Sequence, residues 1–552
     1  MSVNGKDREF RHPGISYLDY KALEMDRVLT AFLARLWHRG LPSRLRRNRE
    51  LTVDSFVELI RDYPEGFAGF AADTDTTRRW VETHLLDLVS RGRTTAKVAG
   101  PRPLHGFAYR FRNSRQSRSY GADEQLYTML EHSSSGDYVL SRLRGFFFPG
   151  VESGTGRITS AVTTDVETQA LLHLVAQAEG HIADTPNDAA PHRVYAPPCP
   201  QQEELLAEDV LKLLQHEQQI PRSVLVDYLK LLFAFHLALH HLRMMKLVPA
   251  AVALGRLDTG CATGHRGGAA HCTYQPHLFT DLTGLPDSGP ARLAARSAEA
   301  WYRRIPAFVQ ASYTIKKLDD LAEYLVGRGR YVYAGGKRYF TAAELLPLLS
   351  SGYEGEREAY AAARLAVVLG SVKPEDQPSE VRQLTSLGLS EFSVYIELLQ
   401  YYRGANRRSY FTDCLDSMLL RNRPGALLAG TRGKQGGRRF ALDSRLLEVL
   451  LQICLLQPDG RGGFSTTALR VDEFLSVLRE RYGLHVDRLP HDDGFSGGHL
   501  DDQAALRENR AAFLHRLREI GYYQDMSDAY LTQTITPRYH VGSATSVSGE
   551  VR

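Results

Sequence analysis

The spacing of hydrophobic residues predicts helices over most of the chain. Residues 17–38 carry leucine, valine and phenylalanine at helical spacing, and Gly40 and Pro42 end that helix. Pro221 divides a long amphipathic stretch into two helices. Predicted helices cover residues 17–38, 53–61, 76–89, 202–253, 291–304, 315–327, 341–349, 356–369, 446–456, 469–478 and 506–520.

Short extended segments follow helices at both ends of the chain. Near the N-terminus, residues 94–98 and 107–111 form a predicted hairpin after three helices. Near the C-terminus, the helix at 506–520 precedes two further extended segments, 522–523 and 530–536. Helices followed by a hairpin are the order of a winged helix, in which the last helix and the wing contact DNA. The same order also occurs in domains that bind only protein.

These elements predict a mainly α protein with small β-hairpins and several domains, in which winged-helix-like domains stand at both ends of a helical centre. The proline-rich segment 184–201 is typical of a linker. The predicted units are an N-terminal winged-helix-like domain at 1–122, a helical segment with linker at 123–200, a central helical domain at 201–440, a C-terminal winged-helix-like domain at 441–539 and a disordered tail at 540–552.

The composition is that of an ordinary globular protein, with 43% hydrophobic and 24% charged residues. Five cysteines in 552 residues give no disulfide framework, which indicates a reducing compartment. The polar residues 1–14 do not form a secretory signal, and the longest apolar stretch, 229–239, is too short to span a bilayer. We therefore expect a cytoplasmic protein without a membrane partner.

Arginine clusters carry more information than the net charge, which is only +4. A phosphate backbone is recognised locally by clustered basic side chains, and three such clusters occur in the chain: the first at 35–49, the second at 102–118 and the third at 403–439. Any one of them alone is more often a solvated surface, but the three together favour binding to double-stranded DNA. The expected phosphate contacts are Arg44, Arg46, Arg47, Arg102, Arg110, Arg112, Arg115, Arg118, Arg432, Lys434, Arg438 and Arg439.

Cysteine and histidine residues gather between Gly260 and Thr273. Upstream, two histidines stand four residues apart, on one face of the helix that carries them. Thiolates and neutral imidazoles suit tetrahedral zinc, and without a His-Glu-x2-His motif a structural ion is favoured over a catalytic one. The alternative is a glycine-rich loop with incidental histidines and reduced thiols. The candidate ligands are Cys261, His265, His271, Cys272, His236 and His240.

The sequence lacks the common motifs of catalysis. It contains no phosphate-binding G-x4-G-K-[ST] loop, no G-x-S-x-G nucleophile elbow and no G-x-G-x-x-G opening a βα unit. We therefore assign no catalytic residue. A metal-dependent nuclease whose carboxylates lie far apart in the sequence is the alternative that motifs cannot address.

Three segments resemble accessory subunits of bacterial methylation-associated anti-phage defence systems. They are Tyr-Leu-Asp-Tyr-Lys-Ala-Leu-Glu-Met-Asp at 17–26, the Cys/His loop at 261–272, and Leu-Arg-Glu-Ile-Gly-Tyr at 517–522. The resemblance implies a protein that works with a methyltransferase, an ATPase or a nuclease, and it carries over no catalytic residue. With the basic clusters, it predicts a non-catalytic DNA-binding and scaffold or sensor subunit of a defence complex. The alternatives are a metal-dependent nuclease subunit and an adaptor that binds only protein.

Overall fold

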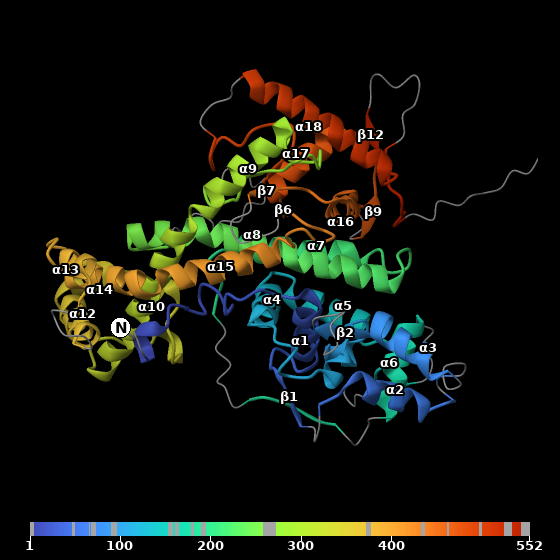
Figure 1. The fold of residues 1–552 in the computed structure, drawn as a ribbon, viewed down its shortest axis with the longest axis horizontal. Coiled ribbons are helices and arrows are strands. Elements are labelled where there is room, and N and C mark those ends of the chain that lie inside the picture. The colour runs from blue at the N-terminus through green and yellow to red at the C-terminus, as the bar shows by residue number, and fades with distance from the viewer. Residues whose placement is uncertain are drawn as a thin grey trace, which may run out of the picture.

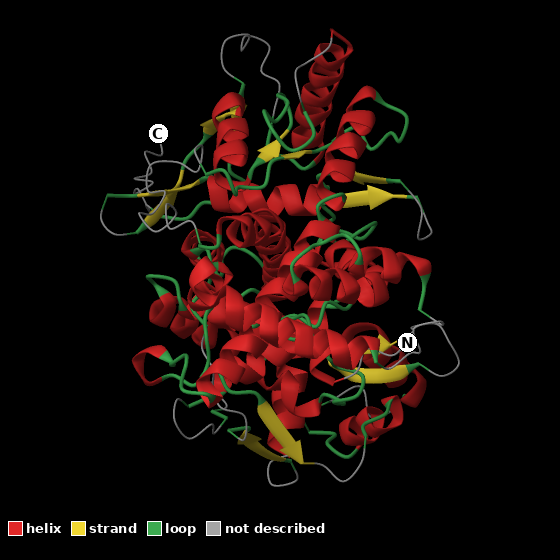
Figure 2. Ribbon diagram, turned by 90° about the vertical axis from the view of Figure 1, so that its left-hand side faces the viewer, coloured by secondary structure: helices red, strands yellow, loops and turns green. Residues whose placement is uncertain are grey.

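A computed structural model gives the fold of the chain. It describes residues 5–46, 50–65, 67, 73–89, 96–152, 158–159, 165–177, 182–188, 195–257, 272–370, 377–431, 437–460, 463–495, 500–523 and 533–542. Figure 2 shows that helices make up most of it and that the strands lie in small separate pairs. The prediction of a mainly α fold with small strand pairs is therefore confirmed.

The fold is organised around the long helix α8 (Arg222–Leu254), which runs across the middle of Figure 1. Pro221 precedes its first turn, and Gly255, with a left-handed φ of 64°, ends it. By length and composition alone the helix could cross a membrane, but 72% of its most apolar window is buried by the rest of the chain. The helix matches the prediction of a long helix that follows Pro221 and ends near residue 253, and its burial is that of a core helix.

One group of helices and strands packs below α7 (Pro200–Leu214) and α8 in Figure 1. Helix α1 is at its centre and contacts α4, α5 and α8. The helices are α1 (Met25–Trp37), α2 (Val53–Arg61), α3 (Thr74–Trp80), α4 (Ala122–Glu131), α5 (Gly136–Phe147) and α6 (Val166–Gln177). The strand pairs are β1 (Ser43–Arg46) with β4 (Ala183–Pro186) and β2 (Leu86–Val89) with β3 (Lys97–Pro101).

A second group of helices lies at the other end of α8, on the left in Figure 1. Its helices are α10 (Ile305–Gly327), α11 (Ala342–Leu345), α12 (Glu354–Leu369), α13 (Ser379–Thr385), α14 (Glu391–Leu399) and α15 (Ala405–Met418). Helix α10 packs along α8 and contacts α11, α14 and α15, while α12 and α13 pack on α14.

The third group lies on the opposite side of α8 from α1, at the top of Figure 1. Its helices are α9 (Gly289–Tyr302), α16 (Ser444–Cys454), α17 (Val471–Tyr482) and α18 (Leu500–Glu519). Its strand pairs are β5 (Leu278–Phe279) with β11 (Leu484–His485), β6 (Leu428–Gly430) with β7 (Arg438–Phe440), β8 (Leu456–Pro458) with β9 (Phe464–Thr466), and β10 (Leu469–Arg470) with β12 (Thr534–Ile535).

The N-terminal hairpin differs from the predicted one. Strand β3 pairs with the earlier strand β2, and the segment predicted as the second strand is a 3-10 helix, Gly106–Phe111. The alternation of Phe107, Tyr109 and Phe111 suggested one buried face, but Ala108 between them is buried as well. The wing predicted at 107–111 is therefore wrong, because burial on all sides of this segment favours a compact turn over a half-exposed strand.

The C-terminal elements are close to the expected order, with one change in pairing. Strand β12 pairs with β10, which precedes α17, and the amide of Thr536 donates to the Tyr522 carbonyl at 2.9 Å. Helices α17 and α18 pack through stacked Phe474 and Phe513 rings, whose centroids lie 6.1 Å apart. A winged-helix assignment of this region stays a prediction. The domain boundary at 440/441 also stays a prediction, and the parallel pair β5–β11 joins a strand from each side of it.

Candidate nucleic-acid interface and buried polar network

The β1–β4 ribbon presents an exposed face with two arginines. Arg44 lies opposite Thr185, and Arg46 lies opposite Ala183. All four residues are exposed, because alternate residues of a strand share a face and opposite residues of a pair share it too. This face of the ribbon therefore carries two guanidinium groups and no carboxylate.

The other face of the ribbon is hydrogen-bonded to the rest of the protein through Asp184. Its carboxylate accepts hydrogen bonds from Ser43 at 2.6 Å, the Tyr109 hydroxyl at 2.5 Å and His38 at 3.2 Å. Burial raises the pKa of Asp184, but the hydrogen bonds from His38, Ser43 and Tyr109 outweigh it and lower that pKa below its usual value. The ribbon is thus a fixed part of the fold.

Two arginines of the second basic cluster support the ribbon and do not project from the surface. The Arg110 guanidinium lies 3.8 Å from the centre of the Phe107 ring, and its Nε is 3.8 Å from Asp184. Arg112 donates from Nη2 to the Ser43 carbonyl at 3.1 Å. Arg102 is also half-buried. The expectation that these side chains form a wing surface is therefore wrong, because each is drawn into the fold.

The turn after Arg112 carries two exposed arginines, Arg115 and Arg118. Its position is fixed by Asn113, which donates from Nδ2 to the Leu51 carbonyl at 2.7 Å and accepts from the Leu51 amide at 3.0 Å. Together with the Arg112 bond to Ser43, this attaches the turn to the chain on both sides of Arg44 and Arg46. Arg115 and Arg118 thus lie on a turn that is bonded to the segment carrying Arg44 and Arg46, and we call these four exposed arginines the ribbon surface.

Two arginines of the third basic cluster, Arg438 and Arg439, form ion pairs within the fold. Arg438 donates from Nη2 to Asp416 at 2.8 Å, and Arg439 donates from Nε to the buried Asp281 at 3.1 Å. Their side chains are only 19% and 17% exposed, so little of either guanidinium faces solvent. The remaining expected DNA contacts, Arg47, Arg432 and Lys434, lie outside the described residues.

His236, one of the candidate metal ligands, belongs to a buried network between α7 and α8. Its Nε2 donates to Asp209 at 3.0 Å, and its Nδ1 accepts from Gln202 at 3.0 Å. Asp209 is fully buried and also accepts from the Tyr482 hydroxyl at 2.9 Å and from Arg481. Burial raises the pKa of Asp209, but Arg481 and His236 bring it down to about 2. Both ring nitrogens of His236 are thus already engaged.

His240, one turn further along α8, lies beside the buried carboxyl of Glu203. Its Nδ1 is 4.0 Å from Glu203, and its Nε2 lies 3.4 Å from the Ile15 carbonyl. Cys272 is described and buried, whereas Cys261, His265 and His271 lie outside the described residues. The described part of the chain contains no group of three or more histidine, cysteine or acidic side chains placed to hold a metal ion. The zinc site therefore stays a prediction that depends on the loop at 261–272.

Zinc content tests that prediction directly. Protein purified without chelator is expected to contain about one zinc ion per chain by elemental analysis. The double variant Cys261→Ser, Cys272→Ser is expected to lose the ion and to melt at a lower temperature, because a structural ion contributes to folding free energy. The matched control is Cys414→Ser, since Cys414 is a buried thiol on α15 and is not one of the candidate ligands. Metal-free wild-type protein would contradict the site.

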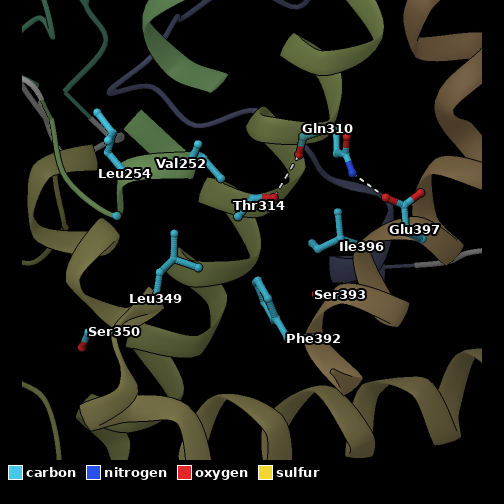
Figure 3. A pocket seen from close by; sticks show the side chains of 12 residues that line it. Val252, Leu254, Gln310, Thr314, Leu349, Ser350, Phe392, Ser393, Ile396 and Glu397 are labelled. Atoms are coloured by element: carbon cyan, nitrogen blue, oxygen red, sulfur yellow. Dashed lines mark hydrogen bonds between the residues drawn. The ribbon is translucent and has the colours of Figure 1, made fainter. Parts of the chain in front are cut away.

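A cavity of about 500 Å³ lies at the C-terminal end of α8, between α10 and α14. Val252, Leu349, Phe392 and Ile396 line it in Figure 3, and Gln310 donates a hydrogen bond to Glu397 on its wall. The lining mixes these apolar side chains with the polar Gln310, Thr314, Ser350, Ser393 and Glu397, and among the lining residues only Glu397 is titratable, so it offers no pair of titratable groups for catalysis.

The comparison with protein families decides the wider identity of the chain. The family model for Methylation-associated defense system protein MAD7 matches residues 5–539, which is nearly the whole sequence. The chain belongs to this family. Comparisons with curated proteins and with solved structures give no match.

Membership of the MAD7 family confirms the resemblance to a methylation-associated defence subunit that three short segments of the sequence indicated. Two features of this member were not found from its sequence. The β1–β4 ribbon joins segments far apart in the chain, and its only sequence signal was the alternation Arg44-Leu45-Arg46. The Asp209–Arg481 pair joins α7 to α17 and had no sequence signal.

Proposed function

We propose that this MAD7 family member is a non-catalytic subunit that binds double-stranded DNA and acts as a scaffold or sensor in its defence system. Family membership supports its place in such a system and its association with other subunits. The observation that carries the DNA-binding part is the ribbon surface, where Arg44, Arg46, Arg115 and Arg118 are exposed and make no ion pair with a described residue.

Physical chemistry supports a phosphate partner for such a surface. A two-stranded ribbon is narrow enough to enter the major groove, and arginine donates to phosphate oxygens in a fixed fork. The small side chains of Thr185 and Ala183 opposite the arginines leave room for a backbone to approach. Contacts of this kind set affinity and orientation on the duplex but carry no sequence information.

Removing the four arginines tests the proposal. The variant Arg44→Ala, Arg46→Ala, Arg115→Ala, Arg118→Ala is expected to bind a fluorescent duplex at least about a hundredfold more weakly at low salt, because each arginine–phosphate contact releases about one counterion. The control removes the same charge from four exposed arginines elsewhere: Arg8, Arg328, Arg382 and Arg507. Equal losses in both variants would assign the binding to net charge alone.

Two measurements separate the alternative functions. Incubation with supercoiled plasmid and Mg²⁺ or Mn²⁺ is expected to leave the plasmid intact, whereas chelator-sensitive nicking would favour the nuclease subunit. Absence of duplex binding by the wild-type protein, even at low salt, would favour the adaptor that binds only protein.

A further inference from the structure

A second cavity, of about 560 Å³, lies where the β6–β7 hairpin meets the start of α16 and the C-terminal turn of α18. Its walls are partly apolar, with Leu282, Pro424, Leu428 and Leu442 among them. Small-molecule sites in proteins fall in this range of volume and combine apolar walls with a few polar groups. The charged groups on the wall are Arg423, Arg439, Arg445, Arg516, Asp281 and Asp443.

Both carboxylates of this cavity are satisfied by the protein itself. Asp281 accepts from Arg439 at 3.1 Å and from the amide and hydroxyl of Thr283 at 2.8 and 2.7 Å. Asp443 caps α16 and accepts from the amides of Arg445 at 2.9 Å and Gly425 at 2.7 Å. Neither carboxylate therefore offers itself to a cation, and the wall presents more positive than negative charge.

The guanidinium groups on the wall differ in how many of their hydrogen-bond donors are already used within the protein. Arg423 makes a two-point ion pair with Glu24, at 2.7 and 2.8 Å. Arg516 donates to the Ser444 hydroxyl at 2.9 Å and to the Leu282 carbonyl at 3.3 Å, which are neutral acceptors, and its Nε is 3.5 Å from Glu519. Arg445 is exposed and makes no ion pair with a described residue. Its donors are free for a ligand.

The position of Arg445 in its helix is unfavourable for a cation. It is the second residue of α16, directly after the start of the helix at Ser444. The N-terminus of a helix carries a partial positive charge, which destabilises a cation and stabilises an anion there. An anion bound beside Arg445 would therefore interact favourably with the side chain and with the helix end at the same time.

The turn before β6 also lines the cavity and is held firmly. Leu420 and Asn422 both have left-handed φ values, 51° and 57°, which cost free energy in residues other than glycine. Asn422 compensates by donating from Nδ2 to the Gly430 carbonyl at 2.9 Å and accepting from the Gly430 amide at 3.0 Å. This geometry fixes Arg423 and Pro424 on the wall before any ligand arrives.

We propose that this cavity binds a phosphate ester of nucleotide size, with the phosphate at Arg445 beside the start of α16 and the organic part against Leu282, Leu428 and Leu442. The same chemistry is found in a free nucleotide and in a nucleotide unit of DNA. The site is separate from the ribbon surface and does not depend on the function proposed above.

Binding of a fluorescent ATP analogue and of a fluorescent duplex to Arg445 variants tests the site. In Arg445→Ala the dissociation constant for at least one probe is expected to rise on the order of tenfold, since a hydrogen bond to a charged group is lost. Arg445→Glu is expected to abolish that binding without lowering the melting temperature, because glutamate suits a helix N-terminus. The control Arg382→Ala, an exposed arginine on α13, is expected to stay within about twofold of the wild type.

The two probes distinguish the sources of the phosphate. The duplex measurements are repeated in the four-arginine variant of the ribbon surface, so that binding there does not mask the cavity. Loss of the ATP analogue alone identifies a free nucleotide, loss of the duplex alone identifies DNA, and either supports the site. If neither probe binds the wild-type protein, or if Arg445→Glu binds both as tightly as the control does, the proposal is overturned. A failure of the ribbon surface leaves the ATP measurement unchanged, so the two proposals fail separately.

Discussion

Between pH 6.5 and pH 5 the protein is expected to lose on the order of 6 kcal/mol of unfolding free energy through three of its buried, neutral histidines alone. They are His12, His105 and His485, which are 2%, 0% and 8% exposed. Burial lowers the pKa of His12 to about 4 and the pKa values of His105 and His485 to about 3. The ordinary histidine pKa is about 6.5.

The direction of the effect follows from where the protons bind. Below pH 6.5 the unfolded chain protonates these rings while the folded protein does not, so stability is complete above pH 6.5 and falls as the pH drops toward 4 and 3. Each ring contributes about 2 kcal/mol of loss at pH 5. Nδ1 of His105 accepts from the Phe107 amide at 3.1 Å, and Nδ1 of His12 accepts from the Gly14 amide at 3.1 Å, so neither nitrogen can take a proton without breaking that bond.

Thermal melts at pH 7, 6 and 5 measure the effect, and one substitution isolates a single ring. Asparagine at position 105 can still accept a hydrogen bond from the Phe107 amide but never gains a charge. His105→Asn is therefore expected to reduce the slope of the unfolding free energy against pH by about 1.4 kcal/mol per pH unit. His515, whose side chain is 69% exposed, provides the control His515→Asn, which should leave the slope unchanged. Equal slopes in the wild type and in both variants would contradict this assignment.

Asp209→Ala is expected to destabilise the protein by about 3–5 kcal/mol. The carboxylate is fully buried and receives hydrogen bonds from Arg481, Tyr482 and His236. Its removal leaves the Arg481 guanidinium without its main counter-charge in a site from which water is largely excluded, and a buried charge without a partner is costly. The melting temperature and the denaturant midpoint measure the loss.

An exposed ion pair of the same kind provides the control. Asp472 pairs with Arg510 at 2.8 Å, and their side chains are 58% and 39% exposed. Asp472→Ala is expected to cost less than about 1 kcal/mol, because solvent screens the pair in the folded state. If the two aspartate variants melt alike, the buried network does not join α7 to α17 as strongly as its geometry indicates.

The helical framework follows from local patterns, and for that reason the sequence predicts it well. The spacing of apolar residues predicts the helix at 506–520, and α18 covers residues 506–519 of it, with Phe513 and Leu517 buried. The prediction of a strand at 107–111 was wrong because a strand, in which every second residue is buried, and a compact turn would both bury the same aromatic residues. Strand β4 overlaps the start of the segment 184–201, which its prolines indicate as a linker, because the pairing of β4 with β1 depends on residues far away in the chain.

The roles of individual arginines could not be predicted from their clustering. Arg110 and Arg115 stand five residues apart in one basic segment, yet the first packs on Phe107 and the second faces solvent. Burial and ion pairing are set by residues distant in the sequence, such as Asp184 for Arg110 and Asp281 for Arg439. Clustering in the sequence identifies basic segments. Only the tertiary contacts show which of their arginines are bonded within the fold and which are exposed to a ligand.

The salt dependence of duplex binding tests the central claim most directly. The logarithm of the association constant is measured against the logarithm of salt concentration for the wild-type protein and for the variant lacking Arg44, Arg46, Arg115 and Arg118. Because each phosphate contact contributes about 0.9 to that slope, the account predicts a slope shallower by about 3 to 4 in the variant. An unchanged slope, with both proteins folded alike, would contradict DNA binding through the ribbon surface.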